Sequence, residues 1–134
     1  MSDETPEVFE IKVDGKGRDI KMTFGLLNEL ARIVGNAAQV TRVAVDQDLR
    51  DDFLECLLVE RTPSGKRVGV ADVEDLGLAP GQVLKLIEWS SMHVMDFLLE
   101  ALAVSTRVDG AIIPRMGLLG ISSGGSTGSE ASAA

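Results

Sequence analysis

Apolar and polar side chains alternate along the first part of the chain, a pattern typical of half-buried β-strands. In segment 8–13 every second side chain from residue 9 is apolar, namely Phe9, Ile11 and Val13. Residues 14–17 (D-G-K-G) suit a tight turn, because glycine adopts positive φ angles without strain. Alternation resumes over residues 18–22, so the pattern predicts a β-hairpin over residues 8–22.

From Thr23 onward, apolar residues recur every three to four positions, which is the period of an α-helix. Thr23 suits a helix N-cap because its hydroxyl can accept a hydrogen bond from a free amide of the first turn. Gly35 suits the end of the same helix. A second helix is predicted to begin after Asp46 and to end near residue 59 or 60. Its buried stripe is expected to contain Leu49, Phe53, Cys56 and Leu57.

The middle of the chain allows more than one interpretation. Residues 37–45 fit either a short strand or a loop. Residues 62–65 (T-P-S-G) predict a turn, and segment 67–71 predicts a short strand after it. If segment 57–61 were extended as well, the two segments would form a second hairpin. Residues 72–78 predict an acidic turn or a single helical turn.

A long helix is predicted over residues 82–105, which contain neither proline nor glycine. Projected at 100° per residue, one face carries the expected core stripe of Leu84, Ile87, Met95, Leu98 and Leu102. The opposite face carries Leu86, Trp89, His93 and Phe97. Since a helix that packs on one small core is polar on its outer side, this second face calls for an explanation. It is expected either to bind a partner protein or to be covered by the hairpin or by residues 111–121.

Regular periodicity ends after Arg107. The apolar segment 111–121 is interrupted by Pro114, Gly117 and Gly120, and residues 122–134 are a serine- and glycine-rich segment of low complexity.

We therefore expect an α+β fold, with an N-terminal β-hairpin followed by a small bundle of three or more helices. One globular domain is expected over residues 8–108. A flexible terminus is expected over residues 1–7, and an irregular, disordered tail over residues 109–134.

Charge and composition exclude several classes of function. The 134 residues carry 13 basic and 21 acidic side chains, which gives a formal net charge of −8. Such a balance argues against binding the phosphates of a nucleic acid. No segment approaches the roughly 20 apolar residues that a membrane-spanning helix needs. A single cysteine is compatible with a reducing compartment, and we expect a cytoplasmic protein with no nucleic-acid or membrane partner.

Residues with catalytic potential are few and scattered. His93 is the only histidine, and Cys56, the only cysteine, lies among leucines as a small core residue does. The acidic groups at residues 51–52 and 72–75 suit helix starts and solvated faces. We therefore expect no enzyme activity, no catalytic residue, no cofactor and no metal ion.

Five segments follow one another in a particular order. A strand pair runs into T-F-G-L-L-N-E-L, and the helix D-D-F-L-E-C-L-L and the turn T-P-S-G-K follow. The long helix L-K-L-I-E-W-S-S-M-H-V-M-D-F-L-L-E-A-L comes last. This order, over about residues 8–108, resembles the tail assembly chaperones of long-tailed bacteriophages. The resemblance is one of segment order, and it assigns no function to individual residues.

The resemblance implies a small, non-enzymatic viral protein that acts in the cytoplasm of the bacterial host. Such chaperones hold the helical tape-measure protein while the tail tube assembles. We therefore expect a helical protein partner and self-association. The contact with the partner is assigned, on the helix projection alone, to Leu86, Trp89, His93 and Phe97. The alternative function is that of a permanent structural or adaptor component of the virion.

Overall fold

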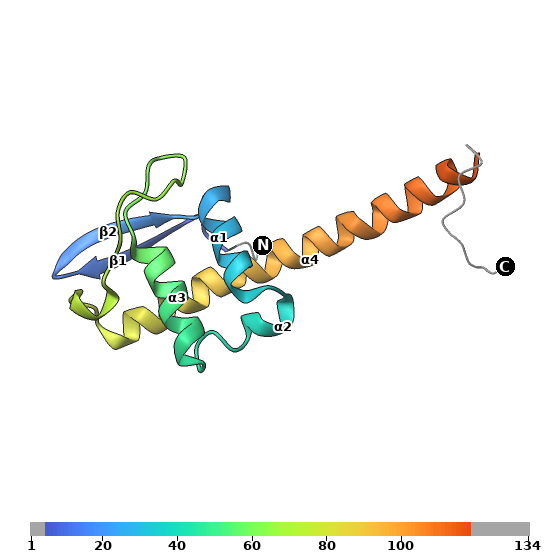
Figure 1. Ribbon diagram of the computed structural model, residues 1–134. Coiled ribbons are helices and arrows are strands. Elements are labelled where there is room, and N and C mark those ends of the chain that lie inside the picture. The colour runs from blue at the N-terminus through green and yellow to red at the C-terminus, as the bar shows by residue number, and fades with distance from the viewer. Residues whose placement is uncertain (1–4, 119–134) are drawn as a thin grey trace. The chain divides into compact units, whose positions relative to one another are not determined.

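The computed structural model describes residues 5–118, and the chain divides into two compact units, Met1–Leu99 and Glu100–Ala134. The first unit contains a β-hairpin, three helices, one 3-10 turn and the first part of the long helix α4, Pro80–Leu118. Figure 1 shows the hairpin, α1 and α3 gathered about that first part of α4. The second unit contains the rest of α4. The predicted α+β fold is confirmed.

The N-terminal hairpin has the predicted position. Strand β1, Val8–Val13, pairs antiparallel with strand β2, Lys16–Lys21. The two residues between the strands, Asp14 and Gly15, both have positive φ angles, 54° and 81°. Two successive positive φ angles define the type I′ turn, whose twist matches that of the flanking strands.

Local capping signals place the next two long helices. Helix α1, Phe24–Val34, begins where the hydroxyl of Thr23 accepts a hydrogen bond from the Leu26 amide at 3.2 Å. It ends at Gly35, which has a φ of 81°. Helix α3, Gln47–Leu58, begins at Asp46, whose carboxylate accepts from an amide of the first turn. Both predicted helices are confirmed.

The structure shows which conformation is adopted by residues 37–45 and 57–78, for which the sequence allowed alternatives. Residues 37–45 contain a short helix, α2, Ala37–Val40, followed by turns. After α3, which includes residues 57 and 58, the chain forms one isolated antiparallel bridge between Arg61 and Arg67. The possible second hairpin is thus reduced to this bridge, and the strand predicted over residues 67–71 does not form beyond it. A single 3-10 turn, η1, Val73–Asp75, precedes α4.

The core of the first unit is built by one face each of the hairpin, α1, α3 and α4. Its buried side chains from α4 are Leu86, Ile87, Trp89 and Val94. The predicted core stripe is correct in part: Ile87 is buried, and Met95 and Leu98 pack partly buried against the core. Leu84 and Leu102 do not belong to it, because their side chains are 56% and 64% exposed. Both faces of the helix are apolar in sequence, so periodicity alone did not determine which face the core covers.

Helix α4 is longer than its sequence pattern predicts. The irregular structure expected from residue 109 onward is wrong as far as Leu118, since the helix includes Pro114. An internal proline removes one backbone hydrogen bond and crowds the carbonyl four residues earlier. That earlier residue is Gly110, whose backbone adapts with least strain. The expected disordered segment 119–134 lies outside the described residues, as do residues 1–4.

No helix within residues 5–118 combines the length and the apolar character needed to cross a bilayer.

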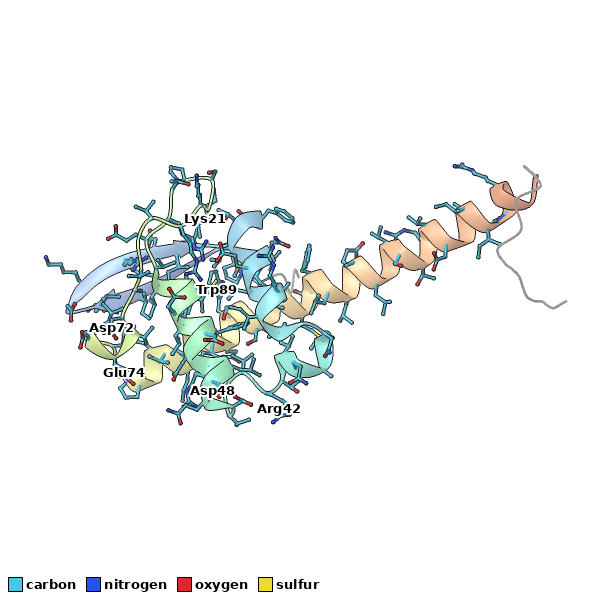
Figure 2. The ribbon with its side chains drawn as sticks, viewed as in Figure 1. Lys21, Arg42, Asp48, Asp72, Glu74 and Trp89 are labelled. Carbon is cyan, nitrogen blue, oxygen red and sulfur yellow. The ribbon has the colours of Figure 1, made fainter. Side chains whose placement is uncertain are left out.

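Trp89 is the largest aromatic side chain of this core, and it is 6% exposed. Figure 2 shows it inside the first unit, whereas Asp48, Asp72 and Glu74 lie on the outside. Replacement of Trp89 by alanine is expected to lower the free energy of unfolding by about 3–5 kcal/mol, because it leaves a cavity in the core. Chemical denaturation of the full chain measures this change.

The matched control is Phe24→Ala, since Phe24 is also aromatic but is 69% exposed. This exposed substitution is expected to change the free energy of unfolding by only about 0.5 kcal/mol. Equal losses at the two positions would contradict the placement of Trp89 in the core.

Candidate interaction surfaces

The four residues predicted to bind a partner lie on one face of α4, but two of them are buried in the first unit. Leu86 is fully buried, and Trp89 packs on Phe9 of β1 with 5.4 Å between the ring centroids. The indole Nε1 of Trp89 donates a hydrogen bond to the carbonyl of Pro6 at 2.6 Å. The hairpin thus covers this part of the face, which was the alternative to an interaction surface.

Partner binding by Leu86, Trp89, His93 and Phe97 stays a prediction, and for the two buried residues it requires the hairpin to move. The other two are half-buried. His93 lies edge-on to the indole of Trp89, with 5.1 Å between the centroids. Its Nε2 lies 2.6 Å from the carbonyl of Pro6 and donates to it, because a carbonyl only accepts.

An exposed aromatic side chain on α1 adjoins this face. Phe24 meets Phe97 in an edge-to-face arrangement at 6.3 Å, and Phe24 is largely exposed. Phe24 is not among the residues predicted to bind a partner, although its place directly after the N-cap of α1 puts it in the first helical turn, at the surface.

The second unit exposes apolar side chains along its helix. They are Leu102, Val104, Val108, Ile112 and Ile113, called the apolar helix segment below. Three of them, Val104, Val108 and Ile112, are four residues apart and so lie in one row along the helix. The charged side chains Glu100 and Arg107 form an exposed ion pair at 3.4 Å. A continuous apolar row on an exposed helix is typical of a surface that binds another protein.

Charged side chains attach residues 60–68 to α1 and α3. The guanidinium of Arg61 binds the carboxylate of Glu29 at 2.7 and 3.1 Å and also donates to the carbonyl of Cys56 at 2.8 Å. Arg67 binds Glu29 at 2.7 Å and Glu55 at 2.9 Å. These pairs link two helices to one loop that has no regular secondary structure of its own beyond the Arg61–Arg67 bridge.

The ion pairs change how Glu29 titrates. Its hydrogen bonds with Arg61 hold the pKa of the carboxyl group at about 2, and those with Arg67 act in the same direction. Desolvation opposes both effects but is outweighed by the contacts with the two arginines. Glu29 is therefore ionised near neutral pH.

Backbone geometry also brings this loop against the start of α1. Gly65 has a φ of 100°, which favours glycine, and a Cβ atom at this position would collide with the hydroxyl of Thr23. Gly25 faces the carbonyl of Gly65, and a Cβ atom at position 25 would lie 3.2 Å from that oxygen, which is a tight contact but not a collision. Glycines at 25 and 65 thus allow the loop to lie directly on the first turn of α1.

Reactive groups contribute little to these surfaces. Cys56 is buried, and burial raises the pKa of its thiol to about 11, so the thiol stays protonated and unreactive near neutral pH. In the part of the chain that the structure describes, no group of three His, Cys, Asp or Glu side chains is placed to hold a metal ion.

Comparison of the chain with protein-family models, with curated proteins and with solved structures gives no match.

Replacement of Glu29 by glutamine tests how far the loop depends on these ion pairs. We expect a loss of roughly 1.5–3 kcal/mol in the free energy of unfolding, because the half-buried Arg61 loses its charged partner. Glu55→Gln is the matched control, since Glu55 pairs only with the more exposed Arg67. That control is expected to cost less than about 1 kcal/mol. Equal effects in a urea titration would show that Arg61 does not depend on Glu29.

The pH dependence of the same pair has a defined sign. The carboxyl of Glu29 has a lower pKa in the folded chain, about 2, than its ordinary value of 4.5. The unfolded chain therefore binds more protons in this range, and the stabilisation disappears as the pH falls from about 5 to 2. The difference in unfolding free energy between the unaltered protein and Glu29→Gln should shrink over that range. A difference that is the same at pH 6 and pH 3 would contradict the ion pair.

Proposed function

We propose that this protein is an assembly factor of the tail assembly chaperone type, which binds a helical partner such as a tape-measure protein. The partner is held by the apolar helix segment of the second unit. The protein acts by binding, and the proposal involves neither a cofactor nor a catalytic step. The order of segments in the sequence supports the chaperone class, and the exposed helix supports the mode of binding.

The observation that carries the proposal is the exposure of the apolar helix segment. Full burial of one Val, Leu or Ile side chain contributes roughly 1.5–3 kcal/mol. Within residues 100–115 every residue but Ala103 is exposed, so this gain is not realised within the described part of the chain. Isolated helices of this length are marginal in water, and packing against a partner would stabilise the helix itself.

The spacing of the exposed side chains favours a helix as the partner. Val104, Val108 and Ile112 form a ridge with a four-residue repeat, and such ridges pack into the grooves of a second helix. Helix-in-groove binding uses anchors at this same spacing. Leu102 and Ile113 are also exposed, but they lie on another side of the helix, roughly 120–140° around its axis from Val108.

The side of the helix away from the ridge supplies a matched control for mutation. Val104→Asp with Val108→Asp places two carboxylates on the ridge. Ala103→Asp with Gly110→Asp adds the same charge on the side of the helix away from that ridge. Each double variant changes the net charge equally, so a difference between the two reports on position and not on charge.

The test is co-expression with the product of the longest helical reading frame beside the gene, followed by co-purification. We expect the unaltered protein and the Ala103/Gly110 variant to retain the partner. The Val104/Val108 variant should bind at least about tenfold more weakly, since that loss corresponds to only about 1.4 kcal/mol. Equal retention by both variants would reject the apolar helix segment as the binding surface.

Mass spectrometry of purified virus particles separates the chaperone from the virion component. A chaperone leaves once the tail is complete, so the protein should be absent from particles. Stoichiometric amounts in the particle would reject the chaperone function and support a permanent structural or adaptor protein.

A further inference from the structure

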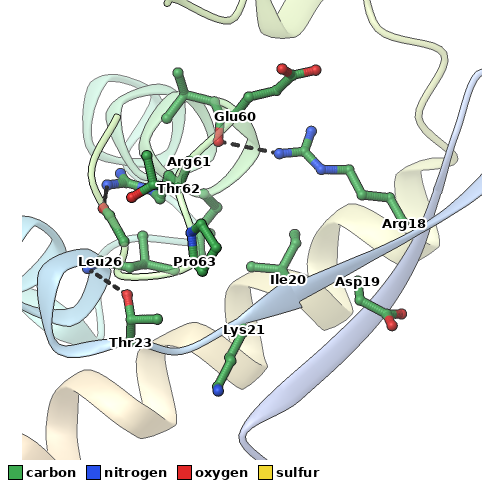
Figure 3. Close-up of a pocket in the computed structure, with 13 residues that line it drawn as sticks. Arg18, Asp19, Ile20, Lys21, Thr23, Leu26, Glu60, Arg61, Thr62 and Pro63 are labelled. Carbon is green, nitrogen blue, oxygen red and sulfur yellow. Dashed lines mark hydrogen bonds between the residues drawn. The ribbon is translucent and has the colours of Figure 1, made fainter. Parts of the chain in front are cut away.

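A cavity of about 540 Å³ lies in the first unit between strand β2 and residues 59–65. Its apolar lining comes from Ile20, Leu26, Leu57, Val59 and Pro63 (Figure 3). The volume lies within the range of ligand-binding sites in proteins. Two backbone edges border this cavity, and their hydrogen-bonding groups indicate what kind of ligand it takes.

The first edge is the side of β2 that faces away from β1. The Met22 amide donates to the carbonyl of Glu7 at 2.8 Å, so these two opposite residues are a hydrogen-bonded pair. Bonded and non-bonded pairs alternate along an antiparallel ladder. In the register of this hairpin, Ile20 is therefore bonded to β1, whereas the amide and carbonyl of Asp19 and the amide of Lys21 are turned outward.

The second edge belongs to residues 60–62. The Thr62 amide donates to the carbonyl of Lys66 at 2.8 Å, and the Val68 amide donates to the carbonyl of Glu60 at 2.7 Å. These two bonds flank the bridge between Arg61 and Arg67, so the amide and carbonyl of Arg61 are turned away from Arg67. Residues 59–63 line the cavity and residues 66–68 do not, so this outer edge borders the cavity.

A positive charge without an acidic partner also lies at the cavity. The guanidinium of Arg18 donates to the carbonyls of Leu58 and Val59 at 2.6 and 3.2 Å. Among the ion pairs of residues 5–118, none involves Arg18. Figure 3 shows Arg18 and Ile20 on the cavity side of β2, with the carboxylate of Asp19 turned away. A ligand with a carboxylate would complete the pairing of this half-buried cation.

We propose that this cavity binds an extended segment of a partner protein, which adds as a strand between β2 and residues 60–62. The segment is about four residues long, matching the four residues of β2 that line the cavity. Its backbone pairs with Asp19 on one side and Arg61 on the other, as in other cases of strand addition. One side chain fills the apolar lining at Ile20, and an acidic side chain two residues away binds Arg18.

The probe is the peptide acetyl-Val-Thr-Asp-Thr-amide, in which valine and aspartate lie on the same face of an extended chain. It is titrated into the ¹⁵N-labelled full chain and followed by the amide signals in NMR spectra. We expect saturable shifts confined to residues 17–21 and 59–63. The peptide with lysine in place of aspartate should bind at least about tenfold more weakly, because it places a like charge at Arg18. Shifts confined to other residues, or none at millimolar peptide, would overturn the proposal.

A proline substitution tests the backbone pairing itself. Asp19→Pro removes the outward amide of β2 without removing a bond to β1, and edge strands tolerate proline at such positions. Glu10→Pro is the matched control, since Glu10 lies opposite Asp19 and its amide faces the other edge of the hairpin. Peptide binding should be lost in Asp19→Pro and kept in Glu10→Pro. Equal binding by both variants would reject strand addition.

Hydrogen exchange on the unaltered protein gives a test that does not depend on how the variants fold. The Asp19 amide should exchange rapidly in the free protein and slowly with bound peptide, whereas the Ile20 amide should be protected in both states. A protected Asp19 amide in the free protein would show that the edge is already occupied, and would overturn the proposal. The site lies in the first unit, so this result is independent of helix binding by the second unit.

Discussion

The packing of β1 against the first part of α4 is the contact on which the first unit depends. Phe9 lies on the ring of Trp89, and the carbonyl of Pro6 accepts hydrogen bonds from both Trp89 and His93. These bonds join residues more than eighty positions apart, so the first and last segments of the unit are held together. The hairpin turns one face to α4, and the edge of β2 that is not paired with β1 borders the cavity beside residues 59–65.

A second long-range contact builds the other wall of that cavity. Glu29 on α1 binds Arg61 and Arg67, and these pairs determine where residues 60–68 lie. The loop has little apolar surface of its own to bury, and Val68 and Val70 are exposed. Charged hydrogen bonds therefore hold this loop in place, whereas the helices are held in place by apolar packing.

Local signals in the sequence predicted where the helices and strands lie, whereas tertiary contacts decided which of their faces are buried. Thr23, Asp46 and the Asp14–Gly15 turn act within a few residues, so their effect is visible in sequence. The rotation of α4 depends on what covers each of two apolar faces, and the core takes Ile87 from the face predicted to be buried and Leu86 and Trp89 from the opposite one. For the sites, the sequence singled out the aromatic face of α4 but missed the cavity, because the pairing of Glu29 with Arg61 across 32 residues has no periodic signature.

The close approach of Gly65 to Thr23 also bears on how this fold can diverge. Any side chain at position 65 would displace the hydroxyl that caps α1, so the loop and the helix start cannot vary separately. Loss of an N-cap hydroxyl costs about 1 kcal/mol, a modest penalty that a second substitution can offset. Descendants of this sequence that replace Gly65 are therefore expected to change residue 23 as well, and the two positions should covary among homologues.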